Sequence, residues 1–134
     1  MLTGECFCGN VRYEADAQAF DETVCHCSFC RRIAGAIAVA WFSIPRSALR
    51  FVSGTPVSFQ SSARVTRRFC RDCGTPLTFE MEDRPDEVDV TTCSLEDPET
   101  MPPKDHTQAA SKLAWVHLSD GLPVYPEWRP EGTR

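Results

Sequence analysis

The sequence lacks a long apolar run, and it lacks a basic, apolar leader. Its first ten residues, MLTGECFCGN, contain neither a positive charge nor an apolar segment, so we expect no secretory signal peptide. No stretch is long enough to span a bilayer, and we expect no membrane association. These absences predict a cytoplasmic protein, in which thiols stay reduced and clustered cysteines favour metal binding or catalysis over disulfides.

Internal repeats, low-complexity tracts and linkers are also missing. A chain of 134 residues is long enough to bury a hydrophobic core. Its hydrophobic content of 42% and charged content of 25% are ordinary for a globular protein. We therefore expect one domain over residues 1–134.

Lysine is scarce, since twelve of the fourteen basic residues are arginine, and the net charge is -5. Residues 1–79 hold nine Arg and six Asp or Glu, which gives +3, whereas residues 80–134 hold five Lys or Arg and thirteen Asp or Glu, which gives -8. An acidic chain with a pI near 5.1 lacks the positive footprint that phosphate contacts require, so we expect no nucleic-acid partner. Arginines instead suit forked contacts with carboxylates.

Helical periodicity is sparse, and short alternating segments separated by Gly, Pro and Asn predict a mainly β fold. One short helix is expected at Ser28–Ala34 and a turn at Pro45–Leu49. The predicted strands are Leu2–Phe7, Val11–Ala15, Thr23–Cys27, Ile37–Ser43, Val57–Gln60, Val65–Phe69, Leu77–Glu82, Val88–Thr92 and His106–Ala110.

Cysteine is the abundant exception, with eight residues in three clusters and one isolated position. They form C-x-C at Cys6 and Cys8, C-x-C-x-x-C at Cys25, Cys27 and Cys30, and C-x-x-C at Cys70 and Cys73, with Cys93 alone. The C-x-x-C-G motif is typical of a zinc knuckle, in which the glycine lets backbone amides turn toward the sulfurs. A knuckle supplies two ligands and needs two more.

The N-terminal pair can complete this knuckle, because alternate residues of a strand point the same way. Cys6, Cys8, Cys70 and Cys73 are therefore predicted to form a structural zinc site. The alternative of two disulfides or loose thiols is disfavoured in a reducing compartment. A thioredoxin-type redox role for Cys70 and Cys73 would require a motif that opens a helix in a βαβ unit, and the sequence does not show this pattern.

The remaining cluster offers three thiolates and leaves one position of a tetrahedral ion open, as in catalytic zinc sites. Cys25 and Cys27 are expected on one strand face, and Cys30 follows as the chain enters the helix. A zinc bound to three thiolates is a weak carbonyl polariser but a good host for a further soft ligand. An incoming thiol would lose its proton and become a nucleophile, so the spacing indicates thiol chemistry.

Two residues could change this interpretation. His26 lies between two ligands and would point to the opposite strand face, where it would be a hydrogen-bonded core or rim residue rather than a ligand. Cys93 could fold back and close the second site with a fourth thiolate. The plainer role for Cys93 is a buried free thiol that packs as a small apolar residue.

The sequence resembles the glutathione-dependent formaldehyde-activating enzymes, a family that also includes centromere protein V. The resemblance rests on GECFCGNVRYEA, CHCSFCRRIAGA and FCRDCGTPLTF in this order, with SLEDPE and DGLPVY as corroborating segments. It implies a zinc-stapled β-tent (Mss4-like) fold with two zinc ions per chain. Cys93 departs from the family pattern, in which a small residue such as Gly, Ala or Ser is usual at this position.

The resemblance also implies roles for the clusters and an activity. Cys6, Cys8, Cys70 and Cys73 match the structural zinc ligands, and Cys25, Cys27 and Cys30 match the catalytic zinc ligands. The implied reaction condenses glutathione with formaldehyde to S-hydroxymethylglutathione, and is formally a carbon-sulfur lyase reaction in reverse. A small-molecule thiol and an aldehyde are therefore the expected partners.

Arginines near the clusters are candidates to bind the carboxylates of the thiol substrate. Arg31 and Arg32 follow the third ligand directly, and they are the residues we predict for this role. Arg64, Arg67, Arg68 and Arg71 crowd the approach to the second knuckle. The alternative is a solvated basic face, which is usual for exposed charges.

Two other functions remain open at this point. One is a noncatalytic Mss4-like binding module that zinc stabilises. The other is a redox switch formed by Cys25, Cys27 and Cys30. An open metal position that accepts a thiol would distinguish the enzyme from both.

Overall fold

The computed structural model describes residues 1–130, which form ten strands and one α-helix. The strands are β1 (Leu2–Glu5), β2 (Arg12–Ala15), β3 (Phe20–Cys25), β4 (Val39–Pro45), β5 (Leu49–Ser53), β6 (Val57–Ser62), β7 (Val65–Phe69), β8 (Pro76–Met81), β9 (Glu87–Thr91) and β10 (Asp105–Thr107), and the helix is α1 (Ser28–Ala34). Short 3₁₀ turns cover residues 46–48, 92–94, 98–100 and 109–111. The predicted mainly β fold with one or two short helices is confirmed.

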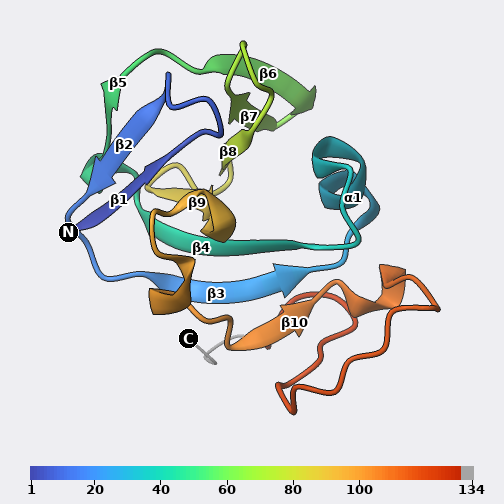
Figure 1. Ribbon diagram of the computed structural model, residues 1–134. Helices are drawn as coiled ribbons and strands as arrows, with labels where there is room; N and C mark the ends of the chain where they lie inside the picture. The colour runs from blue at the N-terminus through green and yellow to red at the C-terminus, as the bar shows by residue number, and fades with distance from the viewer. Residues whose placement is uncertain (131–134) are drawn as a thin grey trace.

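Two sheets make up the fold. The smaller has the order β1-β2-β5, and the larger has the order β10-β3-β4-β9-β8-β7-β6. All strand pairs are antiparallel except β10 with β3, which is parallel. In Figure 1, β6 and β7 lie at the far side of the molecule from β3 and β10, with β9 and β8 between them, and α1 lies where β3 ends and β4 begins.

The larger sheet buries one face in the hydrophobic core. Phe42 and Ile44 of β4 and Val90 of β9 are fully buried there. They pack in one cluster with Tyr13 and Ala15 of the smaller sheet. Because side chains alternate along a strand, the residues between them must point to the other face of the larger sheet.

That second face lines a cavity. Trp41 and Ser43 of β4, Asp89 of β9 and Phe79 of β8 all contribute to its wall. Ser43 pairs with Asp89, and Asp89 pairs with Phe79, so these residues form one row across three strands. The sheet therefore divides an apolar core from a polar cavity along single strands.

The helix α1 has the predicted bounds, and local capping explains both of its ends. The sulfur of Cys27 accepts a hydrogen bond from the Cys30 amide at the N-terminus. Gly35 ends the helix in the left-handed conformation, with its amide bonded to the Arg31 carbonyl. The helix thus holds Cys30 inward while Arg32 faces solvent.

Each of the nine predicted strands overlaps an observed strand, but two boundaries near the cysteines were wrong. β1 ends at Glu5 and β3 ends at Cys25. Cys6 and Cys8 therefore lie in a turn, and Cys27 is the helix cap rather than a strand residue. Strand β5 (Leu49–Ser53) was not predicted, because its sequence, LRFVS, follows a turn and is half exposed.

The C-terminal segment is attached to the larger sheet by a buried arginine. Arg129 Nε and Nη2 donate to Asp105 of β10 at 2.8 and 2.9 Å, and Nη1 forms an ion pair with Asp21 of β3 at 3.0 Å. Forked contacts of this kind fix geometry as well as charge. They keep the residues that follow β10 close to one end of the cavity.

No helix among residues 1–130 is long and apolar enough to cross a membrane.

Gly4 of β1 is a test of the packing of the smaller sheet against the turn at residues 92–94. A Cβ at this position would collide with the buried Tyr13 hydroxyl and would lie 2.6 Å from the Ser94 carbonyl oxygen. We expect Gly4→Ala to lower the free energy of unfolding by about 1–3 kcal/mol, the usual cost of overpacking. Urea denaturation with a saturating metal concentration would measure this loss.

The control is Gly121→Ala, at a position where an added Cβ meets open space. Because its φ is +75°, this variant should lose only about 1 kcal/mol through backbone strain. Unchanged stability of Gly4→Ala would show that β1 does not pack against Tyr13 and the turn at residues 92–94 as described.

Candidate active site

The first cysteine group joins the turn after β1 to the connection between β7 and β8. The sulfurs of Cys6, Cys8, Cys70 and Cys73 all lie within 4.8 Å of one another. The Cys6 and Cys8 sulfurs are 3.6 Å apart, and those of Cys8 and Cys70 are 3.7 Å apart. Four ligands at a zinc–sulfur distance of about 2.3 Å would stand roughly 3.8 Å apart, so the set fits a tetrahedral zinc ion.

Two similar turns shape this group. Cys6 N donates to the Val11 carbonyl at 3.0 Å, and Cys70 N donates to the Thr75 carbonyl at 3.1 Å. In each turn a glycine, Gly9 or Gly74, has a φ of +80°, which brings backbone and sulfurs together without a Cβ clash. The expected effect of the glycine after each cysteine pair is thus observed.

Disulfides are excluded for this group, since all eight cysteines are free and the nearest measured sulfurs are far beyond the bonding distance of about 2.05 Å. The Thr75 hydroxyl and amide lower the pKa of Cys73 to about 5. A thiol that ionises readily is prepared for metal binding, because the thiolate is the ligand form.

The second group consists of Cys25 at the end of β3, Cys27 at the cap of α1 and Cys30 in its first turn. Their sulfurs also lie within 4.8 Å of one another, and those of Cys25 and Cys30 are 3.6 Å apart. Among residues 1–130, no fourth His, Cys, Asp or Glu joins this group. The arrangement therefore brings together three soft ligands that could hold a metal ion, and an open fourth position stays a prediction.

Electrostatics within this group favour a thiolate at Cys27. Hydrogen bonds with Cys25 and with Cys30 lower the pKa of Cys27 to about 2, with a smaller contribution from the charge of Arg67. The same bonds raise the pKa of Cys25. The three sulfurs thus share a negative charge, which suits a cation.

The two residues that could have changed the ligand set lie elsewhere. His26 is buried, and its Nε2 is 2.9 Å from Nδ1 of His106, whose Nε2 lies 2.7 Å from Asp120. It is a hydrogen-bonded core histidine, as expected. Cys93 is exposed in the turn at residues 92–94 and belongs to neither cysteine group, so the expectation that it is buried was wrong.

The second group lies in the wall of a cavity of about 710 Å³. The helix supplies Phe29, and the sheet supplies Trp41 and Phe79, whose rings meet edge-on at 6.1 Å. Trp41 packs in one cluster with Cys25 and Cys30. Apolar rings thus surround the sulfurs on the sheet side, while the open direction faces a space large enough for a small molecule.

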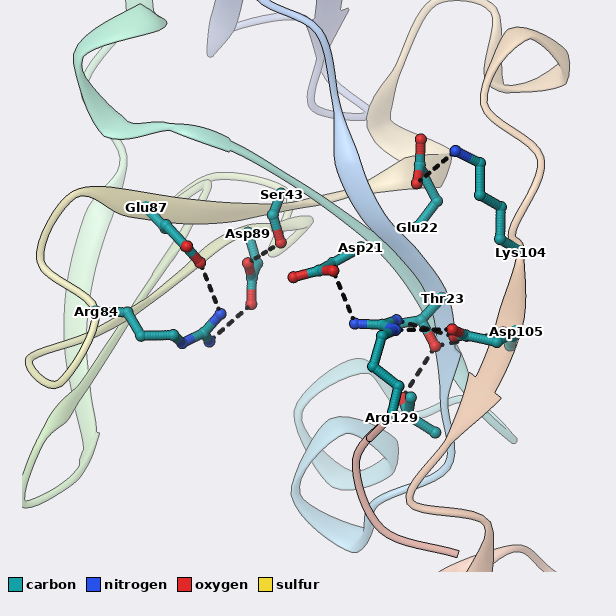
Figure 2. A network of polar contacts seen from close by, with 11 residues as sticks. Asp21, Glu22, Thr23, Ser43, Arg84, Glu87, Asp89, Lys104, Asp105 and Arg129 are labelled. Atoms are coloured by element: carbon teal, nitrogen blue, oxygen red, sulfur yellow. Dashed lines mark hydrogen bonds and ion pairs between the residues drawn. The ribbon is translucent and has the colours of Figure 1, made fainter. Parts of the chain in front are cut away.

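The cavity wall also holds Asp21 and Asp89, each ion-paired with an arginine (Figure 2). Asp21 of β3 and Asp89 of β9 point toward each other on either side of Ser43, whose hydroxyl donates to Asp89 at 2.6 Å. Burial raises the pKa of Asp89, although Arg84 opposes this effect. Along β3, Asp21 lies four residues from Cys25, or roughly 13 Å.

These polar residues were not predicted as part of the site. Among them only Asp89 lies in a segment with a local signal, the alternation of acidic and β-branched residues in EVDVTT, which is typical of a strand with one wet face. The structure shows that this wet face is the wall of the cavity rather than open solvent.

Neither of the arginines predicted to bind substrate lines the cavity. The Arg31 guanidinium donates to the backbone carbonyls of His26 and Ser111, and Arg32 is exposed on α1. Their role toward a substrate carboxylate stays a prediction. The arginines in the cavity wall are Arg67 and Arg84.

Comparison with known proteins gives this site its context. The family model for the glutathione-dependent formaldehyde-activating enzyme matches residues 1–111, which include both cysteine groups. The chain belongs to the glutathione-dependent formaldehyde-activating enzyme family. The resemblance stated from the sequence motifs is thereby confirmed.

A solved structure supports the same fold for this family member. The crystal structure of a Rhodobacter sphaeroides protein superposes with a TM-score of 0.63 at 31% sequence identity. The match covers 78% of this chain and 99% of that chain. No curated protein matches the sequence.

Single cysteine variants should separate the two groups by metal content. We expect wild-type protein to contain two zinc ions per chain and Cys27→Ser to contain one, with the fold retained. Cys70→Ser should lose the other ion and melt at a lower temperature, because metal binding there contributes to folding. Elemental analysis and thermal unfolding would measure both effects.

Cys93→Ser is the matched control, since Cys93 lies outside both groups. It should keep two ions per chain. A drop to one ion in this variant would place Cys93 in the second site and close it.

Proposed function

We propose that this protein is a zinc-dependent carbon-sulfur lyase acting on a thiol adduct, such as S-hydroxymethylglutathione formed from glutathione and formaldehyde. The observation that carries the proposal is the three-cysteine group without a fourth protein ligand, set in the wall of a cavity. Family membership supports glutathione and formaldehyde as the first substrates to test.

Cys25, Cys27 and Cys30 would hold the metal, and the open direction would receive the sulfur of the substrate. A zinc ion bound there would supply the positive charge that keeps an incoming thiol deprotonated near neutral pH. Trp41 and Phe79 form the apolar wall beside this sulfur, whereas Phe29 is largely exposed.

The proposed step forms one bond and opens another. The thiolate sulfur attacks the aldehyde carbon, the carbon–oxygen double bond becomes a single bond, and the oxygen takes a proton to give the hydroxymethyl thioether. The reverse direction breaks the carbon–sulfur bond and returns the thiol and the aldehyde. No oxidant or reductant is needed in either direction.

Cobalt-substituted protein would test the open ligand position. Addition of millimolar glutathione should change the thiolate-to-metal absorption bands, because a fourth sulfur enters the coordination sphere. A flat response would contradict the proposed lyase and would favour the noncatalytic zinc-stabilised module.

Turnover can be followed by NMR detection of S-hydroxymethylglutathione, above the uncatalysed rate of the same mixture. We expect Cys27→Ser to lose at least about tenfold in rate, the scale seen when a metal site is disturbed. Cys93→Ser should match wild type, and equal rates in all three proteins would contradict catalysis at this site.

A further inference from the structure

The cavity contains one cation that no carboxylate neutralises. Arg84 is paired with Glu87 and Asp89 at 3.1 and 3.4 Å. Arg67 of β7 also lines the cavity, and within residues 1–130 it has no carboxylate within salt-bridge distance. No protein carboxylate therefore competes with an anionic ligand for this arginine, whose charge also acts on the nearby Cys27 sulfur.

Arg67 is held firmly and is only 6% exposed. Its guanidinium carbon lies 4.9 Å from the Phe79 ring centre and 6.0 Å from that of Trp41, and its Nε donates to the Ser61 hydroxyl at 3.2 Å. The Phe79 contact follows from the register, since Arg67 pairs with Phe79 across β7 and β8. Stacking and one hydrogen bond thus fix the plane of the fork.

The buried Nη1 of Arg67 has no hydrogen-bond acceptor among the described residues. Leaving a buried donor of a charged group unpaired is unfavourable, and most such groups in folded proteins have a partner. A ligand oxygen that reached this N–H from the cavity would satisfy it. A carboxylate is the ligand group we expect there, because carboxylates commonly form forked contacts with arginine.

We propose that Arg67 binds a carboxylate of the thiol substrate and that the protein selects carboxylate-bearing thiols. This inference rests on the proposed function, because it assumes that the sulfur of the same molecule enters the three-cysteine group. Trp41 packs against Cys25 and Cys30 and lies close to the Arg67 guanidinium, so one small molecule can reach both places.

Charge at the other end of the cavity supports this orientation. The arginines at that end, Arg84 and Arg129, are already paired with carboxylates, among them Asp89 and Asp21, and Asp89 lies two strands from Arg67 in the same row, about 10 Å away. A substrate carboxylate is therefore directed to Arg67. The neutral alternative, in which Arg67 contacts the aldehyde oxygen instead, makes a different prediction for thiols that lack a carboxylate.

The test compares two thiols, glutathione and cysteamine, which carries no carboxylate. Their dissociation constants would be measured by the cobalt absorption bands, and KM and kcat with formaldehyde would be measured separately. We expect Arg67→Met to weaken glutathione binding by about 10- to 100-fold, as for loss of a charged hydrogen bond. Cysteamine binding should weaken by a clearly smaller factor than glutathione binding, because cysteamine has no carboxylate for Arg67 to bind.

Arg67→Lys keeps the positive charge but loses the fork, and it should weaken glutathione binding to an intermediate extent. If the metal content shows that Arg67→Met does not fold, glutathione and cysteamine are compared with Arg67→Lys instead. Arg50→Met is the control, because Arg50 is an exposed residue of β5 paired with Glu14 and lies outside the cavity wall.

Three outcomes would overturn the proposal. Equal losses with glutathione and cysteamine would place Arg67 at the sulfur or the aldehyde oxygen rather than at a carboxylate. Unchanged glutathione binding in Arg67→Met would show that the carboxylate binds elsewhere. No response of the wild-type cobalt bands to either thiol would overturn the proposed function, and the role of Arg67 with it.

Discussion

The alternation of side chains along β4 and β9 determines which residues face the hydrophobic core and which face the cavity. Phe42 and Val90 point into the core, whereas Ser43 and Asp89, their neighbours in sequence, point into the cavity. A shift of one residue in register would bury the carboxylate and expose the core. The antiparallel register of β4 with β9 is therefore the constraint that keeps an apolar interior and a polar binding space on opposite faces of one sheet.

The two cysteine groups use the same ligand chemistry but differ in which parts of the chain they join. The four-sulfur group connects the turn after β1 with the turn before β8, so a metal ion there joins segments more than sixty residues apart. The three-sulfur group draws all its ligands from one short stretch at the end of β3 and the start of α1. Closing a long loop stabilises a fold more than closing a short one, which suits the first group to structure and frees the second for ligand exchange.

Much of the cysteine arrangement could be predicted from the sequence, because ligand number and spacing are local properties. The membership of both groups followed from pairing C-x-C with C-x-x-C, and α1 followed from the residues after Cys27. The sulfurs come together for a different reason than we expected. Cys6 and Cys8 lie in a turn and Cys27 is a helix cap, whereas the sequence analysis placed all three on strands. The cavity could not be predicted, because it depends on the register that joins Arg67 to Phe79 and Phe79 to Asp89. Such long-range pairing leaves no local pattern in the sequence.

The charges around the cavity place a limit on what the open site can accept. Three thiolates on a divalent ion carry a net charge of about -1, and a bound substrate thiolate would make the site more negative. Asp21 and Asp89 at the other end are paired with Arg129 and Arg84, so in the described cavity wall Arg67 is the arginine whose charge no carboxylate offsets. A carboxylate of a bound thiol would therefore find its cation at Arg67. The guanidinium of Arg67, whose charge acts on the three-cysteine group, therefore also sets the direction in which an anionic thiol can lie.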